Sequence, residues 1–114
     1  MTSRVVFTDP DTGLVIDSFE FESLTGDGET LTAHELCVRV LGIAGDPVAL
    51  LDRIESDAAF RAKLLTLEYE PIFQGMHGGK LDVIAGGMIS RAQSMCRAVE
   101  ARIAAEVALQ ECSQ

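Results

Sequence analysis

Leu81 to Glu111, LDVIAGGMISRAQSMCRAVEARIAAEVALQE, is the stretch of sequence that decides the fold. It contains no proline and a single glycine pair, Gly86-Gly87, and apolar residues recur through most of it. This pattern predicts one helix of roughly 45 Å, at about 1.5 Å per residue. A compact domain of this chain length is only roughly 35 Å across. We therefore expect the helix either to bend or to present part of its apolar face to something outside the fold.

Two apolar rows run along this predicted helix. The first advances in alternating steps of four and three residues, the spacing of helices that pack side by side. It predicts a dimer seam, consisting of Ala85, Ala92, Cys96, Val99 and Ile103, with Ile89 in the same row. The second row consists of Leu81, Ile84, Met88 and Met95. Together with Ile89, and with Phe73 and Met76 at its head, it predicts a protein-binding ridge. The alternative is that both rows form the core of a four-helix domain.

The N-terminal 23 residues predict a β-hairpin. Residues 4–8 and 14–22 are rich in β-branched and aromatic side chains, and Phe19 and Phe21 alternate with polar residues. The intervening residues 9–13, DPDTG, are typical of a turn because proline presets one backbone angle and glycine tolerates a left-handed one. A hairpin alone is marginally stable, so we expect it to lie on the helices or to pair with another chain.

Short helices are predicted for residues 32–70. Thr32 is placed to cap the first, which runs to about Ala44 with Gly45 able to close it, and Asp46-Pro47 is typical of the start of the second. Ser56 or Asp57 is placed to cap a third. Pro71 marks a boundary because the residue before proline disfavours the helical conformation. The glycine-rich residues 71–80 then form a connector to the long helix at 81–111. The sequence therefore predicts one mainly α domain, 1–114, with a short N-terminal hairpin and one long C-terminal helix.

The charge is distributed unevenly along the chain. The net charge is −9. Residues 1–79 hold 14 acidic and 5 basic side chains, whereas residues 80–114 hold 4 of each, which places the whole excess in the first part. Direct binding to nucleic acid requires a basic surface, so we do not expect it. A basic protein partner is compatible with this acidity.

Cysteine content and hydropathy predict the compartment. Cys37, Cys96 and Cys112 are odd in number and far apart, which is neither a disulfide framework nor a zinc pattern. No apolar run is long enough to span a membrane, and the N-terminus lacks the apolar region of a signal peptide. We therefore expect a cytoplasmic protein. Whether Cys112 bridges two chains stays open.

No motif predicts catalysis, a metal or a cofactor. The segment GMHGGKL, residues 75–81, has glycines before a lysine but lacks the spacing and the Ser or Thr of a phosphate-binding loop. His34 and His77 lie far apart, and no pair of His or Cys residues has metal-ligand spacing. We therefore expect no enzyme. The alternative is a small-molecule-binding domain or minor enzyme that uses the glycine-rich loop around His77 and Lys80.

The format of the chain resembles a known class of small bacterial regulators. An acidic start from Asp9 to Glu35, a helical middle and a long stretch from Lys80 to Glu111 are similar in arrangement to quorum-sensing anti-activators of the QslA kind. The resemblance implies a helical homodimer that docks on a transcription factor and blocks its dimerisation. It assigns no role to an individual residue. Together with the long helix, it predicts a non-enzymatic protein-binding regulator that sequesters or blocks a partner.

Overall fold

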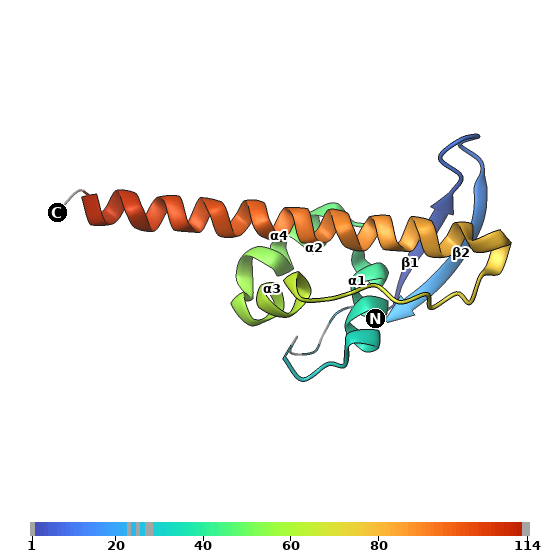
Figure 1. Cartoon of the computed structure of the whole chain (residues 1–114), viewed down its shortest axis with the longest axis horizontal. Helices are drawn as coiled ribbons and strands as arrows, with labels where there is room; N and C mark the ends of the chain where they lie inside the picture. Colours follow the sequence, from blue (N-terminus) through green and yellow to red (C-terminus); the bar gives the residue numbers. More distant parts are fainter. Residues whose placement is uncertain (1, 23, 25, 27–28, 113–114) are drawn as a thin grey trace.

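The computed structural model describes residues 2–22, 24, 26 and 29–112, the side chain of Cys112 excepted. Figure 1 shows the hairpin at one end of the molecule, the short helices packed along the middle, and the long helix crossing the whole molecule. In chain order the elements are β1 Thr2–Thr8, β2 Val15–Glu22, α1 Ala33–Ile43, α2 Pro47–Ser56, α3 Ala58–Leu65, the 3-10 turn η1 Met76–Gly79, and α4 Lys80–Cys112. The predicted mainly α fold with an N-terminal hairpin and a long C-terminal helix is confirmed.

The hairpin packs one face against the helices. β1 and β2 are antiparallel, with Val5 opposite Phe19 and Ser3 opposite Phe21. This register places Val5 and Phe7, both 0 % exposed, on the same side as the two phenylalanines of β2. The ring of Phe73, which precedes η1, lies 5.2 Å from that of Phe7 and 5.0 Å from that of Phe19. The alternation seen in the sequence is therefore the alternation of an inner and an outer face.

Side-chain caps begin each short helix. The Thr32 hydroxyl accepts the backbone N–H of Glu35, as predicted, and Asp46 Oδ1 accepts that of Ala49 at the start of α2. Of the two candidates for α3, Asp57 is the cap and accepts the N–H of Phe60. Each carboxylate or hydroxyl satisfies one of the free N–H groups of a helix start.

Three boundaries differ from the sequence expectation. β1 begins at Thr2, and α3 ends at Leu65, well before residue 70, so that the connector to α4 is longer than predicted. Ala44, not a left-handed Gly45, is the C-cap of α1, and a Cβ at Gly45 would lie 3.2 Å from the carbonyl oxygen of Arg4. Residues 1, 23, 25, 27 and 28 of the predicted hairpin and following loop lie outside the described residues.

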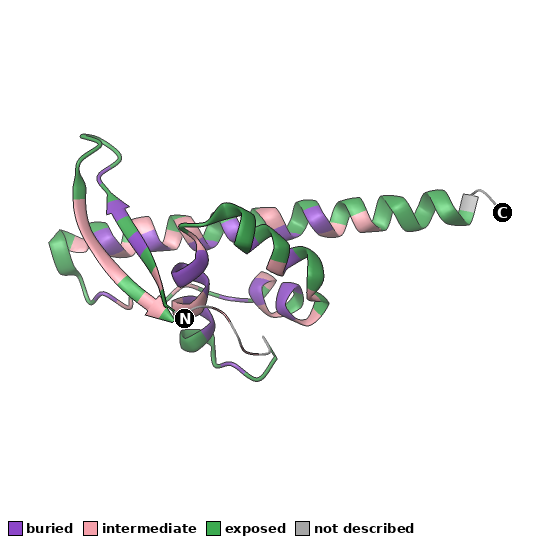
Figure 2. Ribbon diagram, turned by 180° about the vertical axis from the view of Figure 1, so that it is seen from behind, coloured by how far each residue is buried: buried purple, intermediate pink, exposed green. Residues whose placement is uncertain are grey.

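The buried face of α4 lies at the centre of the hydrophobic core. Leu81, Ala85, Ala92 and Cys96 are each 0 % exposed, and α1, α2 and α3 all contact this helix. Figure 2 shows buried segments on α4 only in the part that crosses the body. Beyond Ile103 every described α4 side chain is exposed. The longest dimension of the molecule is 57 Å, with a radius of gyration of 15.7 Å, so the helix extends well past a compact body.

Two polar side chains, one buried and one partly buried, attach the short helices to α4. Arg61 of α3, 7 % exposed, donates to the carbonyl oxygens of Ile54 and Glu55 at 2.7 and 3.1 Å and forms an ion pair with Glu100 at 3.3 Å. Gln93 of α4 donates through Nε2 to the carbonyl oxygens of Leu64 and Leu67 at 3.0 and 2.7 Å. Carbonyl groups at the end of α2 and near the end of α3 thereby receive partners from other elements.

The glycine pair of α4 does not interrupt the helix. α4 continues from Lys80 to Cys112, and a Cβ at Gly86 would lie 3.3 Å from the ring of Tyr69. Gly86 therefore makes room for that ring. Gly87 has no atom within 4 Å of an added Cβ and is exposed. Glycine weakens a helix by up to about 1 kcal/mol relative to alanine. No contact among the described residues requires a glycine at position 87.

The two glycines provide a matched stability test. We expect Gly87→Ala to raise the free energy of unfolding by roughly 0.5–1 kcal/mol, because alanine favours the helix and meets open space. Gly86→Ala should give a smaller gain or a loss, because its methyl group crowds Tyr69. Urea unfolding followed by circular dichroism measures both. Equal gains in the two variants would show that Tyr69 does not press on Gly86.

Candidate functional site

The predicted dimer seam is covered by the chain itself. Ala85, Ala92 and Cys96 are 0 % exposed and Val99 is 4 % exposed, while Ile103 is partly buried. These side chains pack against α1, α2 and α3 of the same chain, so a second copy has almost no area of them to contact. The expectation that this row meets a second copy is corrected. Its heptad spacing reflects packing within one chain.

The predicted protein-binding ridge is divided between core and surface. Phe73, Leu81 and Ile89 are buried, at 7, 0 and 2 % exposed. Ile84, Met88 and Met95 are partly buried and pack against the core, and Met76 in η1 is 46 % exposed. The ridge is therefore not one continuous exposed surface. The parts that reach solvent are Met76 and the flanks of Ile84, Met88 and Met95.

The opposite face of α4 is exposed along its length. The residues on this face, which we call the outer stripe, are Val83, Gly87, Ser90, Ser94, Ala98, Ala101, Ala105 and Ala108, and all are exposed. They recur in steps of three and four, the spacing of a helix face that meets another helix. All but Val83 are glycine, serine or alanine. The hydropathy pattern did not reveal this face, but the regular spacing of its small residues is a signal that the sequence does contain.

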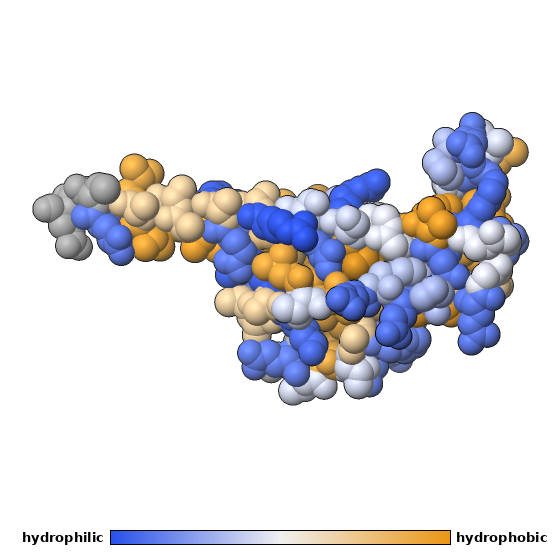
Figure 3. Space-filling view, in the orientation of Figure 1, coloured by the Kyte–Doolittle hydropathy of each residue, from blue (hydrophilic) through white to orange (hydrophobic). Residues whose placement is uncertain are grey.

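The last turns of α4 extend beyond the body. Residues 104–111 are all exposed, and Val107 and Leu109 are 47 and 70 % exposed. Figure 3 shows hydrophobic surface gathered along this projecting part of the helix. We call residues 104–111 the overhang. Its apolar side chains are covered by no other described element.

A hollow separates the first turns of α4 from β1. Its volume is about 430 Å³, and the residues that line it include Val6, Val83, Gly87 and Met88. Val6 and Val83 are 49 and 75 % exposed, so apolar surface faces solvent on both sides of the hollow. The outer stripe, the overhang and this hollow together form the candidate functional surface.

A hydrogen bond and an ion pair join the glycine-rich connector to the hairpin. His77 Nε2 lies 3.1 Å from Asp17 Oδ2, and Lys80 Nζ contacts Asp9 Oδ2. The hydrogen bond from Lys80 lowers the pKa of Asp9, and the same contact raises the pKa of Lys80. Beside them is a hollow of about 210 Å³. Of the two residues of the alternative small-molecule site, Lys80 lines this hollow and His77 does not, and each already contacts a carboxylate of the hairpin.

Asp82 holds the connector against the start of α4. Its Oδ1 accepts the Tyr69 hydroxyl at 2.8 Å and the N–H of Phe73 at 3.0 Å, and its Oδ2 accepts the N–H of Gly75 at 3.0 Å. Burial by itself would raise the pKa of Asp82, but these hydrogen bonds together hold it below its ordinary value of 3.8. Burial and the bond to Asp82 raise the pKa of Tyr69. Sequence reasoning missed this cluster, because no local motif indicates that the connector contacts the start of α4.

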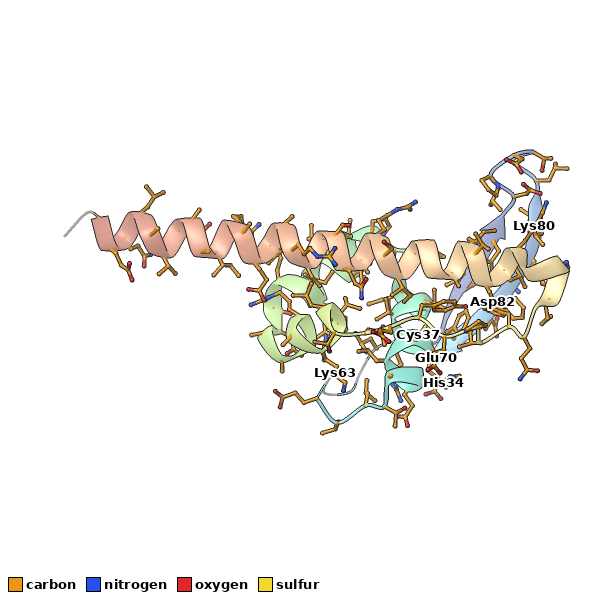
Figure 4. All side chains as sticks on the ribbon, in the orientation of Figure 1. His34, Cys37, Lys63, Glu70, Lys80 and Asp82 are labelled. Atoms are coloured by element: carbon orange, nitrogen blue, oxygen red, sulfur yellow. The ribbon has the colours of Figure 1, made fainter. Side chains whose placement is uncertain are left out.

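His34, Cys37 and Glu70 lie near one another on the other side of the body. Figure 4 shows Glu70 of the connector beside the two α1 side chains, and all three line a hollow of about 70 Å³. Cysteine, histidine and a carboxylate are the groups of some nucleophilic sites. However, Cys37 is 3 % exposed, and burial raises the pKa of its thiol to about 11. Among the described residues no hydrogen bond links the three, so the arrangement lacks an activated nucleophile.

Comparison with protein-family models, curated proteins and solved structures finds no match to this chain. In the part of the chain that the structure describes, no group of three His, Cys, Asp or Glu side chains is placed to hold a metal ion. The same described residues include no helix with the length and apolar character needed to cross a membrane. The surfaces described above are therefore the features of the chain that bear on its function.

Cys37 and Cys96 should resist alkylation in the folded protein. Burial raises the pKa of both thiols to about 11, so only about one thousandth would be deprotonated at pH 8. We expect iodoacetamide to modify them only after urea is added, as measured by peptide mass mapping. Rapid labelling of either cysteine without urea would contradict the burial described here.

Asp82→Asn should destabilise the fold by about 1–3 kcal/mol at pH 7, because an amide cannot accept all three hydrogen bonds. The pKa of Asp82 is lowered in the folded chain. Its contribution is therefore complete above the unfolded pKa of about 3.8 and is lost as the pH falls below it. Urea unfolding at pH 7, 5 and 3 should show the two proteins converging at the lowest pH. A constant difference would mean that the charge of Asp82 is unimportant.

Proposed function

We propose that the chain is a non-enzymatic, protein-binding regulator that acts as a homodimer and sequesters or blocks a protein partner, such as a transcription regulator. The observation that carries the proposal is the exposed length of α4: the outer stripe and the overhang leave one complete helix face without a covering element. A helix of this kind is typical of a surface that associates with another chain.

The outer stripe suits an antiparallel pair of α4 helices. From Val83 to Ala108 it spans roughly 38 Å at about 1.5 Å per residue. Its spacing is close to symmetric about its middle, so that Val83 of one copy faces Ala108 of the other and Ser90 faces Ala101. Small residues at such positions allow helix axes to approach to about 8 Å. In this arrangement Gly87, which no contact within the chain explains, faces a neighbouring helix near Ala105.

The same arrangement gives the overhang a place to bind. In an antiparallel pair, residues 104–111 of one copy lie beside the first turns of α4 in the other, next to the hollow between α4 and β1. Leu109 then approaches Val83, and Val6 lies at the edge of the contact; all three are exposed in the single chain. Stable dimers bury about 1,200–2,000 Å² in total. Two helices with adjoining hairpins offer a surface of that order.

Charge favours α4 as the place of self-association. Each chain carries a net charge of −9, yet residues 80–114 contain 4 acidic and 4 basic side chains and are neutral. Two copies joined through α4 keep their acidic bodies apart, and this lowers the repulsion between them. The acidic bodies remain available to a basic partner. The small-molecule alternative is less well supported because Asp17 and Asp9 already pair with His77 and Lys80.

Matched alanine variants test the dimer. We expect sedimentation equilibrium of the wild type to give twice the 12.2 kDa mass of one chain. Ala101→Glu, in the middle of the outer stripe, should give a folded monomer because it places a bulky charge between the helices. Ala62→Glu, at an exposed position of α3, adds the same charge elsewhere and should stay dimeric. A monomeric wild type, or equal effects of the two variants, would contradict the proposed dimer.

A further inference from the structure

An open hollow lies at the opposite side of the body from the connector. It is bounded by the start of β1, the end of α1 and one side of α2, and its volume is about 830 Å³. Figure 2 shows the exposed outer surface of α2 on the side of the molecule that faces the reader. Asp46, Ala49, Asp52 and Glu55, which line the hollow, are all exposed residues. The hollow is therefore a surface trough that can receive a chain segment, and not an enclosed small-molecule cavity.

The floor of this trough is apolar. Leu24, Ile43 and Ala49 line it, and Ile43 is 8 % exposed and belongs to the hydrophobic core. Val48, one helical turn before Asp52 on α2, is 69 % exposed. An apolar side chain of a partner would find both a buried floor and an exposed aliphatic neighbour here. Burial of such an anchor is the usual energetic centre of a protein interface.

The rim of the trough is acidic. Asp46, Asp52 and Glu55 line it, and Arg53 is the basic side chain beside them. Arg53 is already engaged: it forms an ion pair with Asp57 at 2.9 Å and donates through Nη2 to the carbonyl oxygen of Gly26 at 2.6 Å. The three carboxylates therefore exceed the free positive charge at the rim.

The three carboxylates differ in how firmly they are held. Asp46 caps α2 through the N–H of Ala49. Glu55 lies 2.9 Å from Arg102 in a pair whose side chains are 36 and 52 % exposed, so solvent screens the interaction. Asp52 forms no ion pair within the part of the chain that the structure describes. It is the carboxylate most open to a cation from another molecule.

We propose that this trough binds a positively charged amphipathic segment of a partner protein. An apolar side chain of the segment occupies the floor at Ile43 and Ala49, while its Lys or Arg side chains face Asp52 and Glu55. Charge complementarity selects this occupant: a second copy carries a net charge of −9, and nucleic acid is an anion. The inference rests on the proposed protein-binding function, whose partner chemistry it specifies, but it does not require the dimer.

A peptide titration tests the trough. The probe is a fluorescein-labelled peptide of about 18 residues, or about five helical turns, with leucines on one face and lysines on the other. Two comparison peptides share its length: one has the same composition in an order that destroys the apolar face, and the other has glutamate in place of lysine. We expect the basic amphipathic peptide to bind the full-length protein, measured by fluorescence anisotropy. The other two should bind more weakly by about tenfold or more.

Charge reversal locates the binding. Asp52→Lys should weaken binding by roughly fivefold or more, whereas Asp11→Lys, the same change at an exposed hairpin position, should weaken it by less than about twofold. Ala49→Arg, which fills the floor, should also abolish the preference for the amphipathic order. Circular dichroism of each variant checks that the fold is retained.

Each outcome separates this inference from the dimer. If Asp52→Lys and Asp11→Lys weaken binding equally, or the reordered peptide binds as tightly, the attraction is one of net charge and the trough is not a site. Repeating the titration with Ala101→Glu tests the proposals independently. Site-specific binding by the monomeric Ala101→Glu variant supports the trough and leaves the dimer proposal intact. Site-specific binding by a wild type that is itself monomeric supports the trough and contradicts the dimer, whereas a dimeric wild type without site-specific binding overturns the trough alone.

Discussion

The buried face of α4 is the constraint on which the rest of the structure depends. Each of the other helices contacts this face, and the inner face of the hairpin joins the same core through Phe73. The side chains along it are small or medium in size, with Ala85 and Ala92 between Leu81, Ile89 and Cys96. Small residues let the short helices approach closely, and close packing of apolar atoms stabilises the assembly. The other elements cover α4 only as far as Ile103. Beyond that residue the helix continues into solvent.

Polar contacts then fix how the pieces sit on α4. Arg61 and Gln93 satisfy carbonyl groups at the ends of α2 and α3, and Asp82 binds two backbone N–H groups of the connector. Arg61 is buried and the other two side chains are partly buried, so leaving these groups without partners would cost stability, and this favours one arrangement. Lys80 and His77 are exposed, and they contact the hairpin through Asp9 and Asp17. Residues that in the sequence suggested a ligand site thus serve to join distant segments.

The molecule has an acidic part and a part without net charge. The body, residues 1–79, carries 14 acidic and 5 basic side chains, whereas the long helix region is balanced. A neutral helix with an outer stripe of small residues suits close contact between identical chains, where like charges would repel. An acidic body with an apolar-floored trough suits a basic partner. The two proposals therefore use separate surfaces, and one chain can serve both at once.

The sequence by itself determined the local structure. The caps Thr32 and Asp46, the turn at Gly13 and the alternation of Phe19 and Phe21 depend on a few neighbouring residues, so their positions could be predicted. The long helix was predictable for the same reason. Only the tertiary structure decided which face of α4 is covered, because two apolar rows of similar strength run along it and hydropathy does not say where α1, α2 and α3 pack. It also decided the Asp82 cluster, in which the connector contacts the start of α4, and the trough, in which the acidic side of α2 meets Ser3 and Leu24 from earlier in the chain.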